Sequence, residues 1–483
     1  MMSGAAGTSI AIQKLTIASS ILDRLACQAL SWARPPHVPP DSRLGWQMPP
    51  LYDVHPQGTR VTQEIKVRST DSSPVGSTAR VRTVLAIVMV AGFALRLIAM
   101  EVMNDGLNSP FVSDETSYAR LATALAEGRG YVDEDGTPHI YRPPGVPFLV
   151  SLAFRITEPR VLVARVFMCA LGTMLIPVCY LLGASLGNAR VGLLSAVSAA
   201  VFPNWVYYSG WVLTDLTSAT LVGLAAWMLI EGWRRNALLW FAAGGAAWGL
   251  AALTRPTCLA FGPAVVLWVL VVMPNWRRRT LAALVTCVAL AAMIAPWAVR
   301  NTLVHDQFVF ASSLGGRGGM TLWVGNNPNA TGFLSKDFAY FQQTGSKLFS
   351  REDYPHPLDR ANAYKADAVK FVQENPGRFV RLCAVRFVQL WKVYSPRVPL
   401  AQSLVTIASF GVALLFFLIQ AARRGWRRSP EMLMLLLIAS QTAVHMVFAA
   451  SVRYRIPIEP LVLVMAAAGF FWSFDRLRKA QPG

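Results

Sequence analysis

The sequence predicts an all-helical protein that crosses a membrane many times. Of its 483 residues, 54% are hydrophobic and only 15% are charged, whereas ordinary soluble proteins carry about 25% charged residues. Apolar runs of about 20 residues recur, each long enough to cross about 30 Å of hydrocarbon. The net charge of +19 comes from arginines clustered between these runs. Cytoplasmic loops of membrane proteins show this pattern, so the charge indicates topology and no nucleic-acid partner.

In chain order, the first segment is residues 1–80. Its first 30 residues have no continuous apolar core, so they do not resemble a cleavable signal peptide. Prolines, which break long helices, occur at Pro35, Pro36, Pro39, Pro40, Pro49 and Pro50. We expect this segment to be a disordered cytoplasmic tail.

Ten apolar runs follow and are the predicted spans. They cover about residues 83–103, 160–183, 190–210, 212–231, 238–254, 257–273, 280–298, 400–421, 431–450 and 457–474. Two further apolar patches, 144–157 and 379–394, are short or rich in basic residues. They suit helices that lie in the membrane interface.

The basic residues assign a side to each loop. Arg80 and Arg82 precede the first run, so its start is placed in the cytoplasm. With 144–157 kept on the surface, all the later arginine clusters also fall inside; they lie in residues 184–190, 231–237, 274–280, 422–430 and the C-terminal tail. Both termini are therefore expected to be cytoplasmic, and the outer segments are 104–159, 299–399 and 451–457.

This topology divides the chain after the tail into three parts. Residues 81–300 form a transmembrane module that includes the first outer loop, 104–159. Residues 301–399 form a small outer-face domain with an interfacial helix, and 400–483 hold the last spans and a basic tail. Six cysteines show no spacing typical of a metal site or a disulfide framework.

The first outer loop carries an acidic pair and an arginine. Ser113 can cap a helix whose first turn holds Asp114 and Glu115, although acidic residues there also simply suit the helix dipole. Arg142 follows in the stretch Tyr141-Arg142-Pro143-Pro144-Gly145. Arginine binds phosphate through its planar fork of donors. The loop thus offers a candidate base and a candidate phosphate-binding cation.

Further charged residues lie at the predicted outer ends of spans. Asp215 begins the fourth span, and the positive-inside rule does not explain the outer arginines. They are Arg255, Arg453 and Arg455, the last two flanking Tyr454. These residues either surround an anionic head group at the interface or pair with acidic loop residues.

Together these features resemble the membrane-embedded GT-C glycosyltransferases and, within them, glycosyltransferase family 39. That family includes the dolichyl-phosphate-mannose protein mannosyltransferases and the lipid A aminoarabinose transferases. The resemblance covers about residues 83–474. It rests on Asp114-Glu115, Tyr141-Arg142-Pro143-Pro144-Gly145, Leu213-Thr214-Asp215, Leu253-Thr254-Arg255-Pro256, Pro296-Trp297-Ala298-Val299-Arg300-Asn301, Gly325-Asn326-Asn327-Pro328 and Arg453-Tyr454-Arg455-Ile456-Pro457.

The resemblance implies an inverting, metal-independent transfer from a polyprenyl-phosphate-linked sugar, without a cofactor. Asp114 would be the general base, Glu115 would orient it or the acceptor, and Asp215 would complete the acidic lining. Arg142 occupies the position of the phosphate-binding cation, which is usually lysine in the aminoarabinose branch. The remaining expected phosphate contacts are Arg255, Arg453, Tyr454 and Arg455.

The expected location is the cell inner (plasma) membrane, with the active site on the periplasmic or outer face. The acceptor, a lipid, a glycan or a protein, stays open, and so does the sugar. Two other classes remain alternatives. One is a flippase or transporter of polyprenyl-linked glycans, and the other is an enzyme of the O-antigen ligase or polymerase type.

Overall fold

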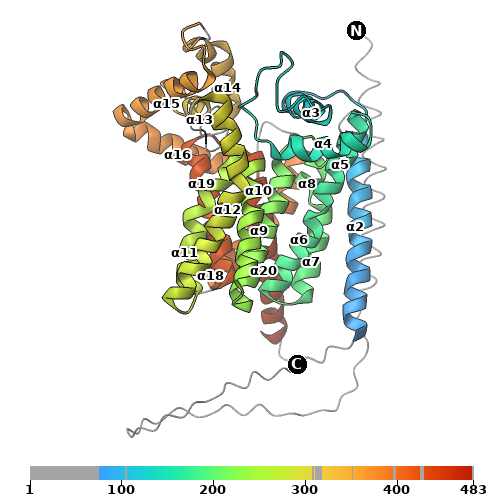
Figure 1. Cartoon of the computed structure of the whole chain (residues 1–483). Helices are drawn as coiled ribbons and strands as arrows, with labels where there is room; N and C mark the ends of the chain where they lie inside the picture. Colours follow the sequence, from blue (N-terminus) through green and yellow to red (C-terminus); the bar gives the residue numbers. More distant parts are fainter. Residues whose placement is uncertain are drawn as a thin grey trace, which may run out of the picture. The chain divides into compact units, whose positions relative to one another are not determined.

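The computed structural model describes residues 75–103, 106–306, 309, 318–350, 352–394, 399–424 and 429–480. The predicted tail lies outside these ranges except for its last residues, because helix α2 (Val75–Met103) already begins at Val75. Within the described ranges no strand forms, and β-type pairing is limited to an isolated bridge between Val132 and Pro138. The prediction of an all-helical, multi-pass fold is confirmed (Figure 1).

Seven helical segments of the described chain are long and apolar enough to cross a membrane. They coincide with seven of the ten predicted runs. They are α2, α5–α6 (Val161–Thr173 and Leu175–Leu186), α9 (Asp215–Arg235), α12 (Trp276–His305), α17–η4–α18 (Leu400–Thr406, Ile407–Gly411 and Val412–Arg424), α19 (Pro430–Val447) and η5–α20 (Val452–Ile458 and Glu459–Ala480).

The other three predicted runs form shorter apolar helices. They are α7 (Ala189–Val201), α10 (Leu238–Thr254) and η1–α11 (Pro256–Phe261 and Gly262–Val272). The run 190–210 is divided because Pro203 cannot continue α7, and a separate six-residue helix, α8 (Pro203–Tyr208), begins there. The packing between α10 and α12 is close. A Cβ on Gly245 would lie 2.2 Å from the Thr286 carbonyl oxygen, so only glycine fits at this contact.

The first outer loop folds into two short helices at one end of the bundle (Figure 1). These are α3 (Asp114–Ala126) and α4 (Gly145–Ile156), which lies on the patch predicted to be interfacial. Tyr118 and Ala122 of α3 pack with Val146 and Val150 of α4 in a buried cluster that also contains Met168 of α5. Apolar burial therefore fixes α3 on the bundle end.

The predicted outer-face domain, which we call the outer segment, forms a second group of helices at the same end (Figure 1). It comprises α13 (Gly318–Gly325), α14 (Leu334–Gln343), η3 (Gly345–Lys347), α15 (Pro357–Glu374) and α16 (Pro376–Trp391). Its core is Trp323, Phe341, Tyr364 and Ala368. Arg386 of α16, 1% exposed, donates to the carbonyl oxygens of Met446 and Val447 at the end of α19, each at 2.9 Å.

The opposite end of the bundle holds the turns predicted to be cytoplasmic. The connections α6–α7, α9–α10 and α11–α12 lie there, at the same end as the beginning of α2 (Figure 1). Their arginines are Arg190, Arg234, Arg235, Arg277, Arg278 and Arg279. The basic turns and the acidic pair of α3 thus occupy opposite ends, as the charge pattern of the sequence predicts.

Candidate active site

Five charged side chains from separate parts of the chain meet at the outer-loop end of the bundle. Asp114 begins α3, Arg142 precedes α4, Asp215 begins α9, Arg255 lies between α10 and η1, and Arg453 lies in η5. They form an alternating series, which we call the charge ladder. It brings together five of the residues singled out from the sequence.

The first half of the charge ladder joins the two residues of the first outer loop. Arg142 Nη2 donates to Asp114 Oδ1 at 2.6 Å. Asp114 Oδ2 lies 3.6 Å from Arg453 Nη1, which is longer than a hydrogen bond. Asp114 is 34% exposed, so solvent or a ligand can reach this carboxylate.

The second half of the charge ladder is fixed by a buried carboxylate. Asp215 Oδ1 accepts from Arg255 Nη1 at 2.7 Å, and Oδ2 accepts from Arg453 Nε at 2.8 Å. Asp215 is 1% exposed. Both oxygens of Asp215, which was expected to complete an acidic lining, are paired, so its carboxylate holds the two arginines in place.

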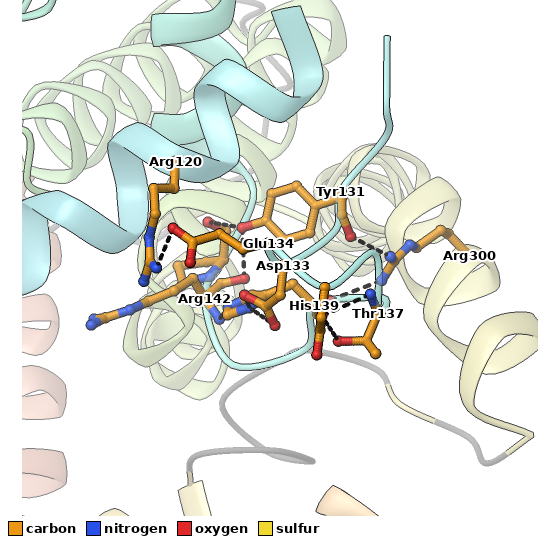
Figure 2. Close-up of polar contacts among 10 residues, drawn as sticks. Arg120, Tyr131, Asp133, Glu134, Thr137, His139, Arg142 and Arg300 are labelled. Carbon is orange, nitrogen blue, oxygen red and sulfur yellow. Dashed lines mark hydrogen bonds and ion pairs between the residues drawn. The ribbon is translucent and has the colours of Figure 1, made fainter. Parts of the chain in front are cut away.

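Arg142 is held on its other sides by the loop that precedes it (Figure 2). Its guanidinium lies over the Tyr118 ring, 4.9 Å from the centroid. The Tyr131 hydroxyl donates to the Arg142 carbonyl oxygen at 3.0 Å. Burial lowers the pKa of Arg142, but the neighbouring Tyr118 and Asp114 more than offset this, so the pKa lies above its usual value. Arg142 is therefore a fixed cation.

His139 connects Arg142 to an acidic neighbour (Figure 2). The Arg142 backbone N–H donates to His139 Nε2 at 3.0 Å, and His139 Nδ1 lies 2.9 Å from Asp133 Oδ1. Since Nε2 accepts, the hydrogen sits on Nδ1 and the ring is neutral. Burial lowers the pKa of His139 and favours this neutral form.

Arg300 of α12 fixes the same loop from the transmembrane side (Figure 2). Its two terminal nitrogens donate to the carbonyl oxygens of His139 at 3.1 Å and Tyr131 at 2.9 Å. Buried backbone carbonyls need such partners. The position of Arg142 thus depends on contacts from its own loop and from a span.

Glu115, which was expected to orient Asp114 or the acceptor, has its carboxylate buried against α5 and the segment before α9. Its carboxylate is 1% exposed, and Oε2 lies 3.4 Å from Arg165 Nη2 of α5. Its Oε1 accepts from the Val212 backbone N–H at 2.9 Å. Burial raises the pKa of Glu115. Glu115 therefore ties α3 to α5 and to the start of α9.

Arg455, which was expected to contact the donor phosphate, lies in a buried ion pair. It is 3% exposed; its Nε donates to Glu459 Oε1 at 2.7 Å, and its Nη1 donates to the Leu390 carbonyl oxygen at 3.0 Å. Arg455 thus links η5 to the end of α16. Tyr454 lies closer to the charge ladder, since the Arg255 guanidinium sits 5.2 Å from its ring centroid.

Sequence reasoning missed Arg165, Asp133, His139 and the contacts of Arg300. A charged residue inside an apolar span needs a partner, and Arg165 in the run 160–183 carried that signal. No periodicity marks Asp133 or His139, because they lie in a loop. Within the described ranges, no group of three His, Cys, Asp or Glu side chains comes together as metal ligands.

Comparison with known proteins supports the fold. Residues 141–299 match the family model described as dolichyl-phosphate-mannose-protein mannosyltransferase. No curated protein matches the sequence. The structure is similar to the archaeal oligosaccharyltransferase AglB from Archaeoglobus fulgidus, in complex with an inhibitory peptide and a dolichol-phosphate, with 16% identity and a TM-score of 0.55. The chain has the GT-C fold.

The extent of each GT-C match differs. The AglB alignment covers 83% of this chain and 51% of AglB, so the chain spans about half the length of that protein. ArnT from Cupriavidus metallidurans aligns in its apo state with 16% identity and a TM-score of 0.39, over 82% of this chain and 78% of ArnT. The family-model match includes Arg142, Asp215 and Arg255 and leaves Asp114 and Arg453 outside.

Proposed function

We propose that this GT-C chain is an inverting glycosyltransferase. It moves a sugar from a polyprenyl-phosphate-linked donor to a hydroxyl or phosphate of an acceptor at the outer face of the membrane. The observation that carries the proposal is the 2.6 Å contact between Asp114 and Arg142, which joins a reachable carboxylate to a fixed cation. The family match and the dolichol-phosphate bound in the AglB structure support a lipid-phosphate donor.

The charge ladder suggests how the donor enters. A phosphate accepts the same bidentate donors as a carboxylate, so the donor phosphate displaces Asp114 from Arg142 and lies between Arg142 and Arg453. Asp114 is then released toward the acceptor. Asp215 stays buried and keeps Arg255 and Arg453 oriented, so the cations are in place before the donor arrives.

The transfer itself is a single displacement. The acceptor oxygen attacks the anomeric carbon from the side opposite the phosphate, and its proton passes to Asp114, which must lie within hydrogen-bond reach. The bond between the anomeric carbon and the phosphate oxygen breaks, and its electron pair stays on the phosphate. Arg142 stabilises that charge, which is the electrostatic contribution that usually dominates such steps.

The proposed location follows from the two ends of the bundle. The basic turns lie at the end opposite α3 and α4 (Figure 1), and basic loops favour the cytoplasm. The site then faces the periplasm or cell exterior, and both termini are cytoplasmic. A reporter fused after Gly136 is expected outside, and one fused after Arg279 inside. If the second reporter reads outside, the proposed orientation is wrong.

Purified protein tests the activity with polyprenyl-phosphate sugars and candidate acceptors. Asp114→Asn should abolish transfer, while Glu374→Gln, which removes an exposed acid elsewhere on the outer segment, should not affect it. Retained transfer by Asp114→Asn would contradict the base assignment. If no variant or wild type transfers sugar but lipid moves across vesicles, the protein is a flippase.

A further inference from the structure

A cavity of about 450 Å³ lies beside the charge ladder. One wall comes from the first outer loop and includes Ser117, Tyr141 and Arg142; the facing wall comes from the outer segment. Ligand cavities usually measure about 300–1,000 Å³. The space therefore suits a saccharide unit and is built by two outer segments that lie far apart in the sequence.

The facing wall combines aromatic rings with a cation. Phe341 and Tyr364 contribute rings whose centroids are 5.8 Å apart, and Arg360 of α15 contributes a guanidinium. Aromatic faces pack against the C–H faces of sugar rings, because both surfaces are apolar. Hydroxyl groups of Ser117 and Ser346, on the two walls, match the polar edges of a sugar.

The charge of the cavity is positive on both walls. Arg360 Nη2 donates to the Tyr141 hydroxyl at 2.8 Å. Across the ranges that the structure describes, no carboxylate lies within ion-pair distance of Arg360, whereas Arg142 has Asp114. A guanidinium has five N–H donors, so Arg360 retains donors for an anionic group. Such a group binds most strongly through charge-assisted hydrogen bonds.

The cavity also lies next to the candidate base. Asp114 and Ser117 are three residues apart in α3, which places them on the same helix face, and Ser117 lines the cavity. Arg142 both lines the cavity and binds Asp114. A saccharide in this space would therefore present hydroxyl groups beside Asp114 while its far end meets Arg360.

We propose that this cavity holds the acceptor and that the acceptor is a saccharide carrying a phosphate or carboxylate group, bound by Arg360. The proposal rests on the transferase activity proposed above and narrows its acceptor to anionic saccharides. Arg360 binds the acceptor and takes no part in bond making. Its loss should therefore raise KM for the acceptor and leave kcat and the donor KM nearly unchanged.

Binding to the full-length purified protein tests the proposal without turnover. Glucose, glucose 6-phosphate and inorganic phosphate are titrated by calorimetry, with excess undecaprenyl phosphate present to occupy the donor cations. Glucose 6-phosphate should bind at least tenfold more tightly than either glucose or phosphate. Arg360→Gln should weaken the binding of glucose 6-phosphate by about 10- to 100-fold, which is the effect of losing a charged hydrogen bond. The affinity for glucose should stay unchanged.

Two further variants complete the experiment. Compared with Arg360→Gln, Arg360→Lys should restore part of the preference for glucose 6-phosphate over glucose. Lys365→Ala, which removes an exposed cation from the same helix outside the cavity lining, should keep all of it. Equal binding of glucose and glucose 6-phosphate, or a preference that survives Arg360→Gln, would overturn the proposal. Failure of the transferase assay alongside Arg360-dependent binding would refute the acceptor role and the proposed function but keep the anionic saccharide site.

Discussion

The pair formed by Glu115 and Arg165 allows a test of whether Glu115 is structural or catalytic. Each side chain is 1% exposed, so neither charge can turn to water when its partner is removed. Breaking a buried ion pair on one side costs about 3–5 kcal/mol, because the other charge stays buried and unpaired. Glu115→Gln should therefore destabilise the protein by about 3–5 kcal/mol.

The double variant Glu115→Leu with Arg165→Met distinguishes a structural role of Glu115 from a catalytic one. Replacing both partners of a buried pair by apolar residues is often neutral or stabilising by about 1–4 kcal/mol. The Val212 N–H would lose its acceptor, at a cost of about 1–3 kcal/mol, so we expect stability near that of the wild type. If Glu115 only positions α3, sugar transfer should return together with stability.

Thermal unfolding in detergent and sugar transfer are the two measurements, made on the wild type, Glu115→Gln and the double variant. The expected order of stability places Glu115→Gln well below the other two. A double variant that unfolds like the wild type but transfers no sugar would refute this reasoning and return Glu115 to the catalytic role predicted from the sequence. Glu374→Gln serves as the control for removal of an exposed acid.

Four further predictions concern the surroundings of the charge ladder. Arg142→Gln should reduce kcat by about 100-fold or more, because the variant loses a hydrogen-bond donor to the transition state, and Arg142→Lys should give an intermediate kcat. Equal kcat values for the wild type and Arg142→Gln would contradict the proposal that Arg142 binds the donor phosphate. Burial lowers the pKa of His139, and protonation of its ring would break the hydrogen bond from the Arg142 N–H. Transfer should therefore fall only at a pH below the ordinary titration range of histidine, and His139→Asn should flatten this acidic limb. Asp215→Asn should weaken donor binding more than it changes the pH profile, since Asp215 orients Arg255 and Arg453. Arg386→Met should lower the free energy of unfolding by roughly 3 kcal/mol, because the carbonyl oxygens of Met446 and Gly325 lose the donor that Arg386 supplies; an unchanged unfolding temperature would contradict that.

The sequence predicted the spans well because apolar length is a local property. Seven predicted runs form full-length helices, and the short patch 144–157 forms α4 outside the spans. The run 190–210 was predicted too long because Pro203 falls inside it and starts a separate helix. Local composition therefore determined the helices, and a single proline determined where one of them ended.

The site was predictable where it depends on one loop. Asp114 and Arg142 share the first outer loop, and the sequence singled out both residues as a candidate base and a candidate cation. The ion pair between Asp215 and Arg453 joins residues 238 positions apart, and only tertiary packing brings them together. Glu115 carried a signal that was not used: it lies three residues before Tyr118, on the same buried stripe of α3. Its position therefore indicated burial.

The alternating order of the charge ladder has a consequence for electroneutrality. It contains three guanidinium groups and two carboxylates, so it carries one excess positive charge. A polyprenyl phosphate sugar is a phosphodiester with one negative charge. When it is bound in the proposed way, the charge ladder and the donor together have no net charge. During the proposed transfer Asp114 gains a proton, while the lipid monophosphate that leaves approaches two negative charges. The charge ladder and the bound lipid phosphate together stay close to neutral, so the reaction moves charge within the site and needs no counterion from the membrane.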